Sequence, residues 1–151
     1  MRIQIDDLTG PDIHALLEEH LAHMHELSPP ESVHALDLSG LRGLDVTFWT
    51  VREGPLLLGC GALRQLTPTH GEIKSMRTPK GLRRKGAGRA VLQHIIGEAR
   101  ARGYLRLSLE TGSQPGFEPA RALYRSFGFT PCGPFGDYRE DPNSIFMTLA
   151  L

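Results

Sequence analysis

The segment Leu82–Val91, LRRKGAGRAV, places four cations and two glycines directly before an apolar helical pattern. Glycines let a backbone approach a ligand closely, and the unpaired amides at a helix start lie at the positive end of its dipole. A phosphate or pyrophosphate is the natural ligand of such a segment. It is not a P-loop, because Ala87 and Gly88 stand where Lys and Ser or Thr are needed. A dinucleotide fingerprint also fails, because Val91 replaces its last glycine.

Length and composition predict one soluble domain over residues 1–151. Hydrophobic residues make up 40% of the chain and charged residues 23%. No apolar run approaches the ~20 residues that span a bilayer. The N-terminus carries acids where a signal peptide would be apolar, and Cys60 and Cys132 form no CxxC motif, so we expect a cytoplasmic protein with free thiols. The net charge is zero, yet residues 74–106 hold ten Lys and Arg against one acid.

Hydrophobic periodicity predicts an α/β fold in which strands and helices alternate. Thr9 is a candidate cap for the first helix, and Gly54 with Pro55 signals a hairpin. We expect strands at 2–5, 45–53, 55–66, 71–78, 105–110 and 144–151, and helices at 9–27, 31–38, 85–103 and 118–128. A strand-helix-strand crossover makes the strands at 71–78 and 105–110 parallel neighbours in a mixed sheet.

The motif Arg83-x-x-Gly86-x-Gly88 resembles the R/Q-x-x-G-x-G/A signature of the GNAT superfamily, the Gcn5-related N-acetyltransferases. Its context fits that family, with GEIKSMRTPKGLR before it and ARALYRSFGFTPCG after it. The likeness is close over residues 71–133, and it indicates a small stand-alone member of bacterial type. It implies a mostly antiparallel twisted sheet of about six to seven strands flanked by about four helices, with a V-shaped opening between the parallel fourth and fifth strands.

The resemblance also implies acetyl-CoA as the cofactor. In the family, backbone amides of the glycine loop hold the CoA pyrophosphate, and the exposed edge of the fourth strand pairs with the pantetheine as an added strand would. The residues that the loop contributes here are Arg83, Arg84, Lys85, Gly86, Ala87, Gly88 and Arg89. The strand edge corresponds to Ser75, Met76, Arg77 and Thr78.

Catalysis in this family is direct attack of a primary amine on the thioester through a tetrahedral intermediate, and the acceptor here would be a small molecule or an amino acid. Tyr124 is the candidate acid for the departing thiolate, and it would lie near the cofactor sulfur; otherwise it is a core aromatic residue. The main-chain amide near Met76 is the candidate oxyanion donor. Glu72 is the candidate base, with Glu110 or water as alternatives. Glu72 could instead pair with Lys74, because residues two apart in a strand share a face.

The acceptor wall is expected from the first helix, the segment after it and the last hairpin. His25, Glu31 and His34 are the candidate acceptor contacts, and the carboxylates of Glu31 and Asp37 would favour a cationic acceptor. No motif in these segments names the acceptor.

No metal site is predicted, because His25 turns away from the helical face that His20 and His23 share. Two other functions stay open. One is an acyl-CoA sensor without turnover, and the other is a basic module that binds nucleic acid phosphates. The neutral chain, whose cations are not interleaved with aromatics, argues against nucleic acid as a partner. Homodimers are common in the family, and nothing in the sequence decides this point.

Overall fold

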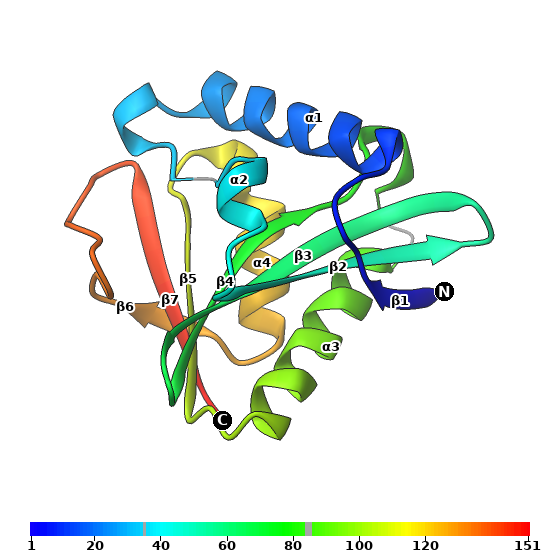
Figure 1. Cartoon of the computed structure of the whole chain (residues 1–151). Coiled ribbons are helices and arrows are strands. Elements are labelled where there is room, and N and C mark those ends of the chain that lie inside the picture. The colour runs from blue at the N-terminus through cyan, green and yellow to red at the C-terminus, as the bar shows by residue number, and fades with distance from the viewer. Residues whose placement is uncertain (35, 84–85) are drawn as a thin grey trace.

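Seven strands form one mixed sheet in the computed structural model, which describes residues 1–34, 36–83 and 86–151 (Figure 1). Their spatial order is β1-β2-β3-β4-β5-β7-β6, antiparallel throughout except for the parallel pair β4 and β5. The mixed sheet with β4 and β5 as parallel neighbours was predicted, whereas the short strand β6 was not. The strands are β1 (Arg2–Ile5), β2 (Val46–Glu53), β3 (Leu56–Thr67), β4 (His70–Arg77), β5 (Arg106–Gly112), β6 (Thr130–Cys132) and β7 (Ser144–Ala150).

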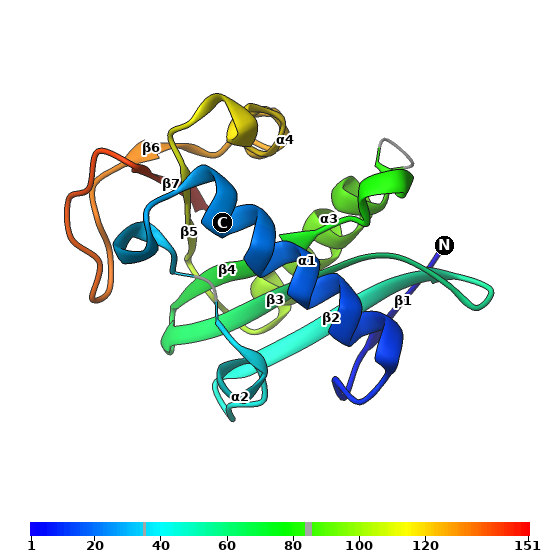
Figure 2. The ribbon, with the colours of Figure 1, turned by 90° about the horizontal axis from the view of Figure 1, so that it is seen from above.

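Helices cover both faces of the sheet (Figures 1 and 2). One face packs on α1 (Pro11–Leu27) and α2 (Leu38–Leu41), in a core cluster that includes Ile13, Leu41 and Phe48. The other face packs on α3 (Ala87–Ala101) and α4 (Glu118–Ser126). The predicted apolar stripe of α3 is buried there, and it consists of Val91, Leu92, Ile95, Ile96 and Ala99. In the described part of the chain, no helix combines the length and apolarity needed to cross a membrane.

The parallel strands β4 and β5 stay together for only three residue pairs. Pairing begins at His70 with Arg106 and ends at Glu72 with Ser108, although β4 continues to Arg77 and β5 to Gly112. A bulge in β4 adds to the divergence, because the register against β3 shifts and Ser75 has a positive φ of 55°. The V-shaped opening is therefore present where the sequence predicted it.

Two local predictions were wrong. Thr9 does not cap α1: its hydroxyl donates to Asp7, and the helix begins after Gly10 without a side-chain cap. Residues 31–38 do not form one helix. A 3-10 turn at Pro30–Ser32 precedes the separate α2, whose cap is the Asp37 carboxylate accepting from the Gly40 amide. The prolines before residue 31 and the capping side chain of Asp37 divide the segment.

Gly112, at the wide end of the opening, tests how tightly this region is packed. A Cβ there would lie 2.1 Å from the Phe117 ring, so we expect Gly112→Ala to lower the free energy of unfolding by about 1–3 kcal/mol. The matched control is Gly97→Ala in α3, where a Cβ meets nothing within 4 Å; it should stabilise by about 0.5–1 kcal/mol. Urea unfolding measures both changes, and equal effects of the two substitutions would contradict the packing described.

Candidate active site

The start of α3 has the features of an anion site. Gly86 precedes the helix in the left-handed conformation, with φ 83°, and supplies no side-chain cap. The first hydrogen bond within the helix runs from the Ala90 amide to the Gly86 carbonyl, which leaves the amides of the first turn without helical partners. A Cβ on Gly88 would lie 3.5 Å from Leu123 and 4.0 Å from Thr78, so α3, α4 and the end of β4 converge here.

The cations of this region are arranged differently from one another. Arg83 is exposed, and the predicted loop residues Arg84 and Lys85 lie outside the described residues. Arg89 lies 4.8 Å from the centre of the Phe127 ring and donates to Ser126. Its guanidinium is thus turned toward α4.

Arg77 is also engaged within the protein. Its buried guanidinium forms a 2.8 Å ion pair with Glu19 of α1 and donates to His23 Nδ1 at 3.0 Å. This contact holds α1 against the end of β4. The part of Arg77 that suits a cofactor is therefore its backbone, as the sequence predicted for this strand edge.

An inner cavity of about 110 Å³ lies in the opening between β4 and β5. Its walls come from α1, β4, β5, α4 and the β6–β7 connection, and among its lining residues are His20, Ser75, Met76, Glu110, Tyr124 and Tyr138. A water molecule takes up about 30 Å³ of liquid volume, so this space suits an acetyl group and an amine rather than a large acceptor.

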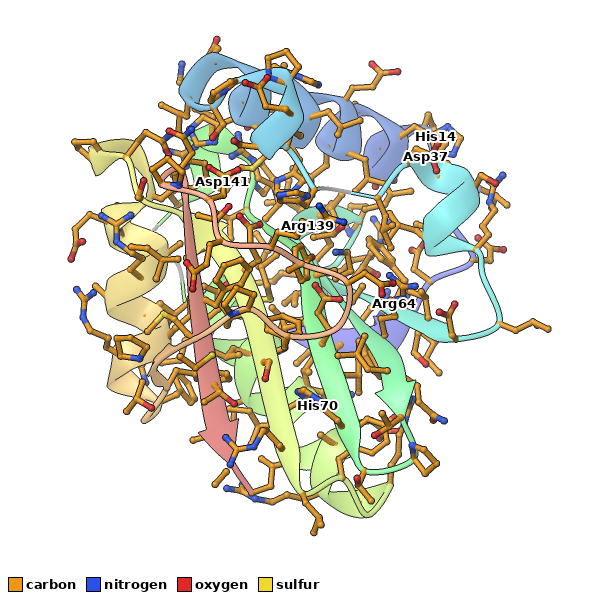
Figure 3. The ribbon with its side chains drawn as sticks, turned by 90° about the vertical axis from the view of Figure 1, so that its left-hand side faces the viewer. His14, Asp37, Arg64, His70, Arg139 and Asp141 are labelled. Carbon is orange, nitrogen blue, oxygen red and sulfur yellow. The ribbon has the colours of Figure 1, made fainter. Side chains whose placement is uncertain are left out.

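An outer cavity of about 820 Å³ adjoins the inner one. The two share four lining residues, which are His34, Glu72, Lys74 and Tyr138. Further out, Arg64 on β3, His70 on β4, and Arg139 and Asp141 before β7 line the outer cavity (Figure 3). A bulky acceptor has room here while its reacting group enters the inner cavity.

Two walls of these cavities are joined by polar contacts. The Ser32 hydroxyl donates to Asp141 at 2.6 Å, and Asn143 donates to the Ser32 hydroxyl at 3.4 Å. These contacts connect the turn after α1 with the loop before β7, two segments that are far apart in the sequence. The cavities therefore have a continuous rim on this side.

Glu72, Lys74 and Tyr138 form a buried polar cluster between the two cavities. The side chains of Glu72 and Lys74 are only 2% and 7% exposed. Oε2 of Glu72 accepts from Lys74 Nζ at 3.1 Å and from the Tyr138 hydroxyl at 2.5 Å, and Lys74 also donates to that hydroxyl at 2.9 Å. The pairing of Glu72 with Lys74, which was the alternative to a catalytic Glu72, is thus present.

Glu110, the other candidate base, has a different environment from that of Glu72. Burial raises its pKa above the usual glutamate value, and interactions with Ser144, His34 and Lys74 offset only part of this effect. Within the described residues, Glu110 takes part in no ion pair. A carboxylate with a raised pKa is a stronger base, and Glu110 has this property.

Tyr124 lies on α4 with its side chain in the inner cavity and its ring 5.8 Å from that of Phe129. Burial, and then the charge of Glu110, raises the pKa of Tyr124. The phenol therefore stays protonated at neutral pH and has a hydrogen to donate into the cavity. Its ring is part of the core, as the alternative prediction held, while its position at the cavity leaves the catalytic prediction open.

The predicted acceptor residues are not all brought together. His34 lines both cavities, with its ring 5.1 Å from that of Tyr138, and Glu31 lines the outer one. His25 is exposed and lines neither of them. Asp37 caps α2, away from Arg139 and Asp141 (Figure 3).

Three site residues were not predicted as such: Lys74, Tyr138 and His20. The sequence placed the last hairpin in the acceptor wall, but nothing in GPFGDYRED singles out Tyr138. Its partner Glu72 lies 66 positions away, and only the fold brings the two together. Within the described part of the chain, no group of three or more His, Cys, Asp or Glu side chains could hold a metal ion.

Comparison with known proteins decides the family. The acetyltransferase (GNAT) family profile matches residues 13–129. The chain belongs to the GNAT acetyltransferase family. It is 62% identical over 151 residues to the uncharacterized N-acetyltransferase YsnE of Bacillus subtilis, covering 100% of both chains. It is also 42% identical over 138 residues to a protein of Azospirillum brasilense named IAA acetyltransferase, covering 90% of this chain and 88% of that one.

Solved structures agree with the GNAT fold. A Klebsiella pneumoniae structure matches with a TM-score of 0.83 and 28% identity, covering 99% of this chain and 97% of that one. A GNAT family acetyltransferase from Elizabethkingia anophelis, solved with acetyl-CoA bound, matches with a TM-score of 0.69 and 16% identity over 99% and 97% of the two chains. The predicted family, fold class and enzyme class are confirmed.

His20 gives this site a testable dependence on pH. Burial, followed by the charges of Arg77 and His23, lowers the pKa of His20 to about 4. An unfolded histidine binds a proton below about 6.5, whereas the folded one does not until about 4, so stability is lost as the pH falls between these values. We expect His20 to account for a loss of about 2 kcal/mol between pH 7 and pH 5.

Urea unfolding of the wild type and of His20→Gln at both pH values measures this loss. The variant should lose about 2 kcal/mol less than the wild type, because glutamine does not titrate. His25→Gln on the exposed side of α1 is the matched control and should behave as the wild type. Equal losses in the wild type and His20→Gln would contradict the assignment.

Proposed function

We propose that this GNAT family member transfers the acetyl group of acetyl-CoA to the amine of a small-molecule acceptor. The observation that carries the proposal is the inner cavity, where a half-buried carboxyl group, Glu110, and a buried phenol, Tyr124, face the same space from β5 and α4. The start of α3 converges with the end of β4, whose Ser75 and Met76 line this space, and the outer cavity adjoins it at Glu72 and Lys74. Donor and acceptor can therefore reach it from different directions.

The residues at the start of α3 fit a CoA pyrophosphate. The free amides of the first helical turn match the demands of a phosphate group, and an added Cβ at Gly86 would meet only the Met1 side chain, at 3.6 Å. The backbone of β4 beyond Glu72 lacks a partner on β5, so it suits the amides of pantetheine, as a strand edge does. When bound there, acetyl-CoA supplies a thioester as the electrophile.

Glu110 receives the proton that the acceptor must lose before its nitrogen can attack. It has the raised pKa of a base and no ion-pair partner among the described residues, whereas Glu72 is held by Lys74 and Tyr138. The β4 bulge at Ser75 turns the strand near Met76, whose amide is the donor that we assign to the developing oxyanion.

The acceptor is an amine whose bulk lies in the outer cavity, beside His34 and Glu31. The name of the Azospirillum relative adds IAA to the compounds worth testing. We place the reaction in the cytoplasm, and the free thiols of Cys60 and Cys132 support a reducing compartment.

Gly86 tests the donor site. A glutamate there adds a charge and a side chain at a position with φ 83°, so we expect Gly86→Glu to weaken CoA binding by more than about tenfold in isothermal titration calorimetry. Gly97→Glu puts the same charge on the exposed far part of α3 and should leave affinity nearly unchanged. Equal affinities of both variants would exclude this anion site.

The acceptor reaction is tested by release of free CoA from acetyl-CoA in a panel of amines, amino acids and IAA. We expect at least one amine to give turnover above hydrolysis, with an acetylated product seen by mass spectrometry. Tight CoA binding without turnover on any acceptor would contradict the transferase and favour an acyl-CoA sensor. Steeply salt-dependent binding to duplex DNA would instead favour the nucleic acid module.

Tyr124 tests the acid role. Removing the hydroxyl that protonates the departing thiolate should lower kcat about 10²-fold in Tyr124→Phe, with little change in KM for the acceptor. Circular dichroism checks that the variant is folded. Full turnover of the folded variant would assign Tyr124 to the core alone.

A further inference from the structure

The two carboxyl groups of the inner cavity, Glu72 and Glu110, have different hydrogen-bond and charge partners. Both lie beyond or at the end of the paired part of β4 and β5, and both line the inner cavity. Two carboxylates that share one site, here a buried and a half-buried one, compete for a single proton. Which of them accepts the proton of the acceptor must therefore be decided by the groups around them.

Glu72 is held in place by hydrogen bonds from its neighbours. Its Oε2 accepts two hydrogen bonds, from Lys74 at 3.1 Å and from Tyr138 at 2.5 Å. The shorter bond has the length of a charge-assisted O–H···O⁻ contact. Lys74 closes the triangle by donating to Tyr138 at 2.9 Å.

Tyr138 is held in this position by aromatic packing on the sheet. Its ring lies 5.0 Å from that of Phe135, 5.5 Å from that of Phe146 and 5.1 Å from that of His34. The loop before β7 thus delivers a fixed hydroxyl to Glu72. Its contact with Glu72 is a built feature of the site rather than an accidental approach of a surface side chain.

We propose that Lys74 and Tyr138 are positioning residues that keep Glu72 out of the proton transfer, so that Glu110 receives the proton of the acceptor. This inference rests on the proposed function. The N–H proton of the acceptor passes to the Glu110 carboxylate, the new N–C bond replaces the C–S bond, and the thiolate takes a proton from Tyr124. Exchange with solvent then removes the proton from Glu110 and returns one to the Tyr124 oxygen. Glu72 and Lys74 keep their charges throughout.

The charge balance of the cavity supports this assignment. Lys74 and Glu72 cancel each other within one cluster, which leaves Glu110 as the unpaired carboxyl group among the described lining residues of the inner cavity. A positive Lys74 favours the ionised form of Glu110 and a negative Glu72 opposes it. The titratable groups that face Glu110 are Glu72 and Lys74 on β4, His34 before α2, Tyr124 on α4 and Tyr138 before β7.

The test is a charge cycle read from the pH dependence of kcat/KM for an acceptor that gives turnover. The low-pH side of this profile, its acidic limb, reports the pKa of Glu110. Glu72→Gln removes a negative charge beside Glu110, so the limb should move to lower pH by about one unit. Lys74→Met removes the positive charge and should move the limb up by a similar amount. The double variant restores neutrality and should return the limb to the wild-type position.

Lys74→Met leaves a buried carboxylate without its partner, and it could fail to fold. In that case Glu72→Gln and the double variant still carry the test, because one should shift the limb and the other should not. Tyr138→Phe adds a further arm. It loosens Glu72 without changing a charge, so we expect a fall in kcat, a nearly constant KM and a smaller upward shift of the limb.

A second readout needs no turnover. In the free protein, ¹³C NMR titration of the Glu110 carboxyl carbon should show a pKa above the usual glutamate value, which decreases in Glu72→Gln and returns in the double variant. If no acceptor reacts yet these shifts appear, the proposed function fails while the charge relationship holds.

Three results would overturn the inference. One is loss of all turnover in a folded Glu72→Gln together with an active Glu110→Gln, which would make Glu72 the base. The second is a lowered kcat in the single variants with an unmoved limb, which would indicate a purely structural cluster. The third is a Glu110 carboxyl that titrates identically in all variants.

Discussion

The separation of β4 from β5 after three residue pairs is the constraint on which the rest of the structure depends. Beyond Glu72 and Ser108 the two strands give up backbone hydrogen bonds, which a sheet does only at a cost. The bulge places Ser75, a residue with a Cβ, at a positive φ, and such strain concentrates at functional sites. In return, the sheet gains a cavity between its strands and a free strand edge beside the start of α3.

Within this opening, burial strengthens electrostatic interactions, so the neighbouring charges decide which carboxyl group can act as a base. In a low-dielectric cavity, an unpaired carboxylate is expensive, and a paired one is a poor base. Glu72 is the paired carboxylate, because it accepts hydrogen bonds from Lys74 and Tyr138. Glu110 is the unpaired one, and its pKa is raised. His20, neutral at physiological pH because of its burial and the nearby Arg77, adds no competing charge to the wall formed by α1.

The sequence predicted what local patterns and one motif can encode. The parallel pairing of β4 with β5, the α3 stripe and the opening followed from the crossover rule, periodicity and the GNAT resemblance, whereas β6 was not predicted as a strand. The roles of the cations did not. Arg89 was predicted to add charge around the anion, yet its guanidinium lies over the Phe127 ring after α4, and the ion pair of the Arg77 guanidinium with Glu19 of α1 was not predicted. Tyr138 escaped prediction because its partner is remote in the chain, and His25 was overvalued because sequence proximity to the acceptor wall does not fix the direction of a side chain.

Titration of the ¹⁵N-labelled protein with CoA, followed by amide chemical shifts, tests the central claim that the opening between β4 and β5 is the donor site. The account predicts the largest shift changes at the first-turn amides of α3, at Ala87, Gly88 and Arg89, and along the β4 edge at Met76 to Thr78. Amides at the far end of α3, from Glu98 to Ala101, should hardly move. Changes centred on the outer cavity or on β6, with the start of α3 unaffected, would contradict it.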